Sequence, residues 1–151
     1  MPNHAEMNLR QNFFSRAVIE RSLELAGIVK LNDTELPVLA EMLGLAGDVR
    51  AQVAALAARF ELQVVALTLG ARGSLLYRGG QFSLCQPQPV VVVDTVGAGD
   101  AFTAALAHGL LFGMEIEEIN AAASEVARHV CSCAGATPPL PPSLSQLFCR
   151  R

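Results

Sequence analysis

Two glycines and an aspartate stand where the sequence changes from an apolar run to a helical pattern. Gly97, Ala98 and Gly99 follow the apolar residues 90–93 and come directly before Asp100, which opens a run of small and apolar residues. Backbone N–H groups at a helix start have no partner within the helix, and the helix dipole favours negative charge there. The turn therefore predicts an anion site, beside which a carboxylate is unfavourable unless the chemistry needs a base.

Phosphoryl transfer is a reaction that needs both parts. Backbone donors stabilise the charge that develops on the transferred group, and a carboxylate accepts the proton of the attacking hydroxyl. The base must lie within hydrogen-bonding reach of that hydroxyl, and the position of Asp100 directly after the glycines would allow this. Aspartate is also a favoured N-cap residue, so Asp100 could instead cap a helix over residues 100–112. The turn by itself leaves both interpretations open.

Other nucleotide-binding and catalytic motifs fit this sequence less well. Residues 97–102 begin like a dinucleotide fingerprint, but Phe102 occupies the third glycine position and the expected acidic residue about 20 positions on is missing. The sequence has no P-loop and no Gly-x-Ser-x-Gly elbow. His4, His108 and His129 are scattered, and His108 is interpreted as a surface or packed helix residue. A dinucleotide-dependent oxidoreductase is therefore the least supported alternative.

Asn32 and Glu35 form a second candidate site. An asparagine followed three residues later by glutamate, before an apolar helical pattern, is typical of a capping box. The same two residues, placed at the end of a strand, could also orient a hydrated metal near phosphates. The two roles are compatible, because capping hydrogen bonds would also hold the two side chains in fixed positions.

The elements that must position these residues follow from hydrophobic periodicity and turn residues. Five strands are expected, at 28–31, at 64–69, at 74–77 and 81–85 as a hairpin, and at 90–93. Helices are expected at 12–26, 35–43, 48–60, 100–112 and 115–133, a tight turn at 70–73, and an extended tail held by Pro138, Pro139, Pro141 and Pro142. Residues 1–11 read as irregular or as a strand remnant. This order predicts an α/β layered domain with a mainly parallel sheet over residues 1–151.

Composition bounds the functional class. The 151 residues are 52% hydrophobic and 17% charged with a net charge of −3, which fits a buried globular domain and argues against a nucleic-acid partner. No apolar run reaches the roughly 18 residues of a membrane span, and the N-terminus lacks the pattern of a signal peptide. The cysteine spacing matches no zinc ribbon, so we expect reduced thiols in a cytoplasmic protein.

The segment from Asp94 to Leu106 resembles the C-terminal signature of the ribokinase-like (PfkB) sugar kinases. Its leading Asp-Thr, its Gly-Ala-Gly-Asp core and its small-residue helix all agree. Residues 30–35 resemble the family's Asn-x-x-Glu motif, residues 68–73 its nucleotide-binding turn, and residues 135–138 its C-terminal nucleotide-pocket loop. Asn8 and Arg10 resemble the Asp-x-Asn-x-Arg segment of the fructokinase and 2-keto-3-deoxygluconate kinase types, with Glu6 in place of the usual aspartate.

The resemblance implies an α/β/α ribokinase-like fold and an ATP-dependent carbohydrate kinase. Asp100 would be the catalytic base, and Gly97, Ala98 and Gly99 the anion hole for the γ-phosphate. Asn32 and Glu35 would position Mg²⁺ through water and phosphate. The remaining nucleotide contacts would come from Thr68, Gly70, Gly73, Ser124 and Gly135, and the sugar contacts from Asn8 and Arg10.

A monovalent cation such as K⁺ is also implied beside the anion hole. Its ligands would be Asp94 and the carbonyl groups of Val96, Val130, Cys133 and Gly135.

Family members are much longer than this chain, and their N-terminal half carries most sugar contacts and a β-type lid. The resemblance therefore implies a C-terminal, nucleotide-binding half whose N-terminal half and lid are missing. Such a half would expose an unpaired strand edge, which favours a homodimer or pairing with the missing half. The alternative function is a non-catalytic nucleotide-binding or interaction remnant of a sugar kinase. The sugar itself is not specified.

Overall fold

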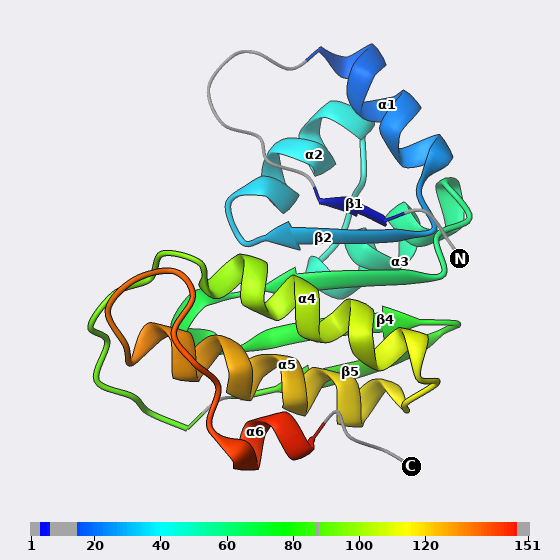
Figure 1. Ribbon diagram of the computed structural model, residues 1–151. Coiled ribbons are helices and arrows are strands. Elements are labelled where there is room, and N and C mark those ends of the chain that lie inside the picture. Colours follow the sequence, from blue (N-terminus) through cyan, green and yellow to red (C-terminus); the bar gives the residue numbers. More distant parts are fainter. Residues whose placement is uncertain (1–3, 7–14, 87, 148–151) are drawn as a thin grey trace. The chain divides into compact units, whose positions relative to one another are not determined.

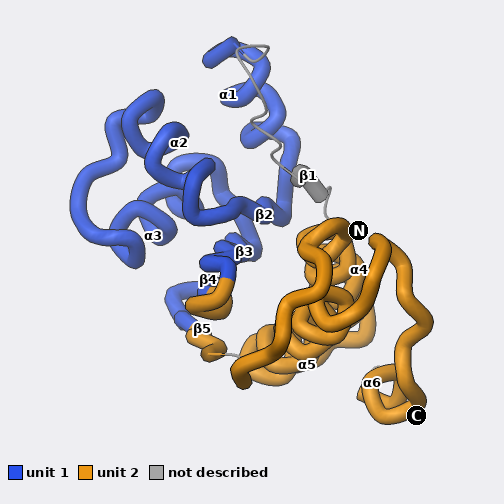
Figure 2. Tube along the Cα trace, turned by 90° about the vertical axis from the view of Figure 1, so that its left-hand side faces the viewer, with its two compact units in different colours: residues 1–70, 75–82 blue, residues 71–74, 83–151 orange. Residues whose placement is uncertain are grey.

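The computed structural model describes residues 4–6, 15–86 and 88–147, which divide into two compact units. The first unit, called here the strand unit, comprises residues 1–70 and 75–82. The second, called the helix unit, comprises residues 71–74 and 83–151 (Figure 2). Asn8 and Arg10, which were predicted to contact the sugar, lie outside the described residues.

Parallel strands joined by helices make up the strand unit (Figure 1). In chain order these elements are β1 (His4–Glu6), α1 (Arg16–Leu25), β2 (Ile28–Asn32), α2 (Glu35–Leu43), α3 (Val49–Arg59) and β3 (Val64–Thr68). β2 pairs with β1 and β3 in parallel, with Ile28 opposite Val64 and Asn32 opposite Thr68. The side chains of β2 and β3 are almost all buried, as their continuous apolar sequences predict.

Side chains and a glycine cap the helix ends in this unit. The Ser15 side chain accepts a hydrogen bond from Val18 N at the start of α1, and the Asp48 side chain accepts one from Ala51 N at the start of α3. Gly44 closes α2 in the left-handed conformation that glycine adopts without strain. The inward faces of these helices and strands form one core cluster that includes Leu23, Val29, Leu39, Leu56 and Val65.

The sheet continues into β4 (Ser74–Arg78) and β5 (Gln81–Cys85), in the order β1-β2-β3-β4-β5. Gly79 and Gly80, both with positive φ, form the predicted two-residue turn between β4 and β5. A hairpin of this kind makes the sheet mixed rather than mainly parallel. A short 3₁₀ turn, η1 (Gly70–Arg72), leads from β3 toward β4 and matches the predicted tight turn.

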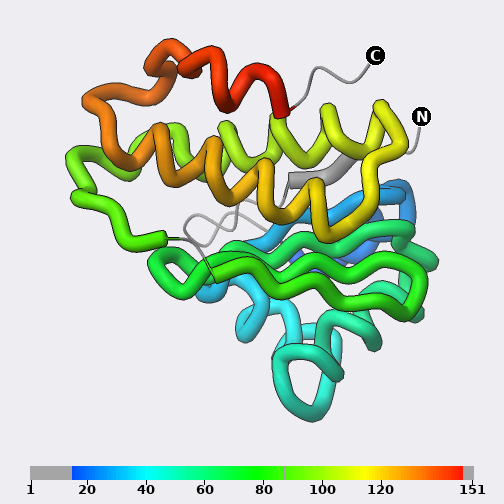
Figure 3. The backbone as a smooth tube through the Cα atoms, turned by 90° about the horizontal axis from the view of Figure 1, so that it is seen from below, coloured from blue at the N-terminus to red at the C-terminus, as the bar shows by residue number. Residues whose placement is uncertain are grey.

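Helices α4 (Ala98–Leu111) and α5 (Ile116–Cys131) pack against each other in the helix unit. Gly109 permits their close approach, since a Cβ atom built there would lie 2.7 Å from Cγ1 of Ile119. Figures 1 and 3 show the chain after α5 turning back, so that the short helix α6 (Pro142–Gln146) lies beside α5. The predicted extended tail is therefore wrong at its end, because Pro142 suits the first turn of a helix.

The predicted strand at 90–93 is also wrong. These residues form no strand, and Val91 is 83% exposed. The segment is tied instead to the end of α5, where the carbonyl of Cys131 accepts hydrogen bonds from Val93 N at 2.8 Å and Asp94 N at 3.2 Å. An apolar run becomes a strand only where a neighbouring strand offers hydrogen bonds, and the described residues offer none here. No helix in the described part of the chain is long and apolar enough to cross a membrane.

Candidate active site

The glycine turn forms the first turn of α4. Gly97 is the N-cap residue, with φ 81° and ψ −7°, and its carbonyl accepts a hydrogen bond from Ala101 N at 2.9 Å. Ala98 N donates to the carbonyl of Thr95. The first-turn N–H groups of a helix lack carbonyl partners one turn earlier in the same helix, so they favour an anion beyond its end. The predicted coincidence of glycine turn and helix start is confirmed.

Gly97 also lies against a second turn, at residues 135–136. A Cβ atom at Gly97 would lie 2.8 Å from the Cα atom of Ala136, closer than real side chains approach. Asp94 joins the same two turns, because its Oδ1 accepts from Val96 N at 3.0 Å and its Oδ2 accepts from Gly135 N at 3.2 Å. The hydrogen bond from Val96, and then that from Gly135, lowers the pKa of Asp94 below its usual 3.8. Asp94 is thus held as a carboxylate beside the anion-site turn.

Asp100 does not cap α4. The N-cap position belongs to Gly97, and Asp100 stands in the first turn with its side chain exposed. Within the described part of the chain, the Asp100 carboxylate makes no hydrogen bond or ion pair. Its oxygens are therefore available to accept a proton, which is the property that a general base requires.

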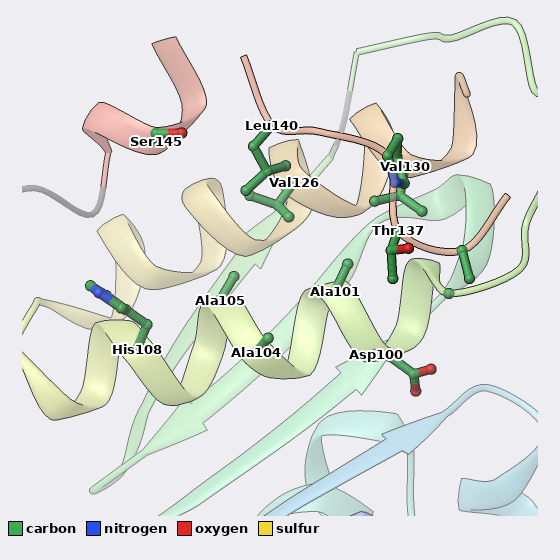
Figure 4. A pocket seen from close by; sticks show the side chains of 13 residues that line it. Asp100, Ala101, Ala104, Ala105, His108, Val126, Val130, Thr137, Leu140 and Ser145 are labelled. Atoms are coloured by element: carbon green, nitrogen blue, oxygen red, sulfur yellow. The ribbon is translucent and has the colours of Figure 1, made fainter. Parts of the chain in front are cut away.

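A cavity of about 640 Å³ extends from Asp100 along α4. Figure 4 shows Asp100 and His108 at opposite ends of the helical segment that lines it, with alanines between them. His129 Nε2 lies 3.0 Å from the carbonyl oxygen of Pro139 and so joins α5 to the segment that closes the far side. The lining residues are Gly97, Asp100, Ala101, Ala104, Ala105, His108, Val126, Val130, Ala136, Thr137, Pro138, Leu140 and Ser145.

Asn32 and Glu35 show the reciprocal hydrogen bonds of the predicted capping box. Oδ1 of Asn32 accepts from Glu35 N at 2.9 Å, and Oε2 of Glu35 accepts from Asn32 N at 2.8 Å. Thr34 also donates to Asn32, through both its N–H and its hydroxyl. These bonds fix both side chains at the carboxyl end of β2. Carboxylate oxygens are an atom type that Mg²⁺ and its bound water prefer, but Oδ1 of Asn32 already accepts three hydrogen bonds. A metal role for this pair therefore stays a prediction.

Thr68 stands beside Asn32 at the same edge of the sheet. The two residues are register partners in β3 and β2, and the Thr68 hydroxyl donates to the carbonyl of Leu31 at 3.3 Å. Gly70 follows with φ 59°. The carboxyl ends of parallel strands are the usual place for ligands in open α/β sheets. The structure therefore brings Asn32, Glu35, Thr68 and Gly70 together within the strand unit.

The other predicted residues belong to the helix unit. Asp94, Val96, Gly97 and Gly135 are linked by the contacts described above. Cys133 follows the end of α5, and its N–H group donates to the carbonyl of Val130 at 3.1 Å. Gly73 belongs to this unit as well, with φ 101°. No group of three or more His, Cys, Asp or Glu side chains suited to a metal occurs among the described residues.

Ser124 is the predicted nucleotide contact whose placement supports that role least. It is buried, its hydroxyl lies 2.8 Å from that of Ser74, and it does not line the cavity. This position favours a structural part, and the nucleotide contact stays a prediction.

Comparison with known proteins assigns the family. The model of the pfkB family of carbohydrate kinases matches residues 1–143. The chain belongs to the pfkB family.

Relatives within the family include sugar kinases of several kinds. A fructokinase from Klebsiella pneumoniae is 39% identical over 95 residues, which cover 63% of this chain and 30% of that protein. The structure of 2-dehydro-3-deoxygluconokinase from Thermotoga maritima superposes with a TM-score of 0.80 at 19% identity, covering 96% of this chain and 49% of that one. Fructokinase from Vibrio cholerae O395, in its form with bound fructose, ADP and calcium, gives 0.78 at 25% identity, covering 97% and 50%.

The pfkB chain thus spans about a third of this curated relative and about half of these solved structures. The ribokinase-like fold predicted from the sequence is confirmed.

Sequence reasoning did not predict a cavity along α4. Its lining includes Leu140 and Ser145, which no motif suggested, and residues 136–138 of the loop that resembles the family's nucleotide pocket. Another signal was the run of small residues after Asp100, which would also let a helix lie close to a sheet. Small side chains serve equally to leave space, and only the path of residues 136–145 decides between the two.

Proposed function

We propose that this pfkB chain takes part in the ATP-dependent phosphorylation of a sugar hydroxyl. The observation that carries the proposal is the exposed carboxylate of Asp100 in the first turn of α4, directly after the glycine turn. A helix start that attracts phosphate and a carboxylate without a partner in the described chain are the two parts that phosphoryl transfer needs. Family membership supports the same reaction class.

In the proposed reaction the sugar hydroxyl oxygen attacks the γ-phosphorus of ATP. The bond between that phosphorus and the β,γ-bridging oxygen breaks, and ADP leaves. Asp100 accepts the hydroxyl proton. The backbone of Gly97, Ala98 and Gly99 would stabilise the negative charge on the transferred group, because its N–H groups are held in place before the reaction starts. Since the N–H of Ala98 donates to the carbonyl of Thr95, those of Gly97 and Gly99 would contribute most.

The remaining roles follow from the family resemblance. Asn32 and Glu35 would hold Mg²⁺ through water, and a bound Mg²⁺ neutralises charge on the phosphates. Thr68, Gly70, Gly73 and Gly135 would contact the nucleotide. Asp94 and nearby carbonyl groups would bind K⁺.

We propose fructose or a keto-sugar acid as the acceptor, with Asn8 and Arg10 as contacts. The fructokinase relatives and the 2-dehydro-3-deoxygluconokinase structure support this choice. A homodimer, or pairing with a further half of the pfkB fold, is proposed as the working form, since the chain spans about half of the solved structures.

We propose as a second candidate a protein that binds nucleotide without transferring phosphate. The two candidates differ in one measurable property, namely whether ADP release depends on sugar.

Calorimetric titration of the chain with Mg·ATP tests the feature that both candidates share. We expect saturable binding that is weaker for AMP, because AMP lacks the phosphate that the turn would hold. NAD serves as the control for the dinucleotide alternative and should not bind. Failure of Mg·ATP to bind, or equal affinity for AMP, would contradict the proposed nucleotide site.

A further inference from the structure

A buried polar network joins α5 to the residue that follows Gly73. Asn120 in α5 is 0% exposed, and Ser74, the first residue of β4, is 2% exposed. The Ser74 hydroxyl donates to Oδ1 of Asn120 at 2.5 Å, and Nδ2 of Asn120 lies 3.4 Å from the Ser74 carbonyl oxygen. The Ser74 hydroxyl is thus held by a short bond to one side chain of α5. The Ser74 carbonyl makes only a long contact, because Nδ2 has two protons and lies closer to both oxygens of Ser83.

The proton directions in this network can be assigned from its geometry. A serine hydroxyl carries one proton. Because the proton of Ser74 is directed to Asn120, the 2.8 Å bond between the Ser74 and Ser124 hydroxyls uses the proton of Ser124. Ser74 therefore donates and accepts at once. Loss of its hydroxyl would leave polar atoms of Asn120 and Ser124 without this partner in a buried place.

Asn120 also bonds a residue that does not adjoin the Gly73 turn. Nδ2 of Asn120 donates to the carbonyl oxygen of Ser83 at 2.9 Å and to its hydroxyl at 3.1 Å. Ser83 lies in β5 and is as well buried as the rest of the network, with 7% exposure. The Ser74 and Ser83 hydroxyls thus contact the same Asn120 carboxamide, but only Ser74 adjoins Gly73.

We propose that Ser74, held by Asn120 and Ser124, is a positioning residue that fixes the Gly73 turn for nucleotide binding. The inference rests on the proposed function, because it assumes that this turn contacts the nucleotide. Gly73 has φ 101°, a conformation that glycine adopts freely and can also leave freely. Asn120 and Ser124 both bond the Ser74 hydroxyl and so restrict the freedom of the adjoining Gly73. The turn is then ordered before the nucleotide arrives, and less binding free energy is spent on ordering it.

The test compares Ser74→Ala with Ser83→Ala, two variants that each remove one hydroxyl from the same buried network. Both should lose stability in urea unfolding, which shows that the network is disturbed in each. Calorimetry should show Mg·ATP affinity reduced about tenfold in Ser74→Ala and by less than about twofold in Ser83→Ala, since a hydrogen bond in a buried network is worth about one factor of ten. A purely structural role predicts equal affinities in the two variants, and that result would overturn the inference.

Amide hydrogen exchange supplies a readout that does not depend on the nucleotide. Exchange at residues 71–73 should be faster in Ser74→Ala than in the unchanged chain, and unchanged in Ser83→Ala. Unaltered exchange in Ser74→Ala would overturn the inference even if the chain binds Mg·ATP. If the unchanged chain binds no Mg·ATP, the proposed function fails while the exchange result still decides whether Ser74 positions the turn.

Discussion

Asp94 is the residue whose contacts tie the anion-site turn to the segment after α5. Its carboxylate accepts from the backbone N–H groups of Val96 and Gly135. Val96 adjoins Gly97 and Gly135 adjoins Ala136, the two residues at which the turns meet. The same two hydrogen bonds lower its pKa below 3.8. The Asp94 carboxylate therefore stabilises the contact between the two turns in the absence of any cation or nucleotide.

The first prediction concerns the pH dependence of this contact. A depressed folded-state pKa contributes stability that is fully present above the unfolded-state pKa, near 3.8, and is lost as the pH falls through the lower folded-state value. Asp94→Asn should therefore be less stable than the unchanged chain at pH 7. The difference in the free energy of unfolding should shrink below pH 3.8. Urea unfolding at several pH values measures it, and a difference that does not change with pH would contradict this role.

At the scale of elements, the start of α4 depends on how closely two turns approach. Gly97 supplies both the left-handed conformation at the N-cap and the absence of a side chain facing Ala136. Gly113, which follows α4, also has positive φ, but a Cβ atom there would meet nothing within 4 Å. An alanine at either position would pay for the left-handed backbone conformation, but only an alanine at Gly97 would also clash with a neighbour. Comparing the two variants therefore isolates the effect of the clash.

We predict that Gly97→Ala destabilises the chain more than Gly113→Ala does. The left-handed conformation alone costs a residue with a side chain about 1–2 kcal/mol, and this cost applies to both variants. The conflict with the Ala136 backbone adds to it in Gly97→Ala alone, and should weaken Mg·ATP binding as well, because the turn must move apart. Thermal or urea unfolding of the pair measures the first effect and calorimetry the second. Equal losses in both variants would show that the close approach to Ala136 is unimportant.

Local sequence signals predicted most individual elements correctly. The helix that follows Asp48, the Asn32–Glu35 hydrogen bonds and the Gly79-Gly80 hairpin all depend on neighbours within a few residues. The predictions that failed depend on distant partners. Residues 90–93 have the composition of a strand, yet the N–H group of Val93 donates to the carbonyl of Cys131, far along the chain.

At the scale of the whole molecule, the chain combines a strand unit and a helix unit, and each unit holds one group of the predicted site residues. Asn32, Glu35 and Thr68 cluster in the strand unit, and Asp94, Gly97 and Asp100 in the helix unit. The motifs identified both groups, because their residue types are fixed by backbone conformation and chemistry. The motif at 135–138 indicated a pocket-lining loop. The cavity along α4 was still not predicted, because it depends on the path of residues 136–145 relative to a face of small side chains.

Fructose-dependent ADP release by the unchanged chain and by Asp100→Asn tests the central claim most directly. Asparagine keeps the size of the side chain but cannot act as the base, and removal of a general base typically lowers the rate about 10²- to 10⁴-fold. We predict ADP release that requires fructose in the unchanged chain, a loss of that size in Asp100→Asn, and nearly equal Mg·ATP affinity in both. Equal rates in the two proteins, or ADP release that does not depend on sugar, would contradict the assignment of Asp100 as the base of a sugar kinase.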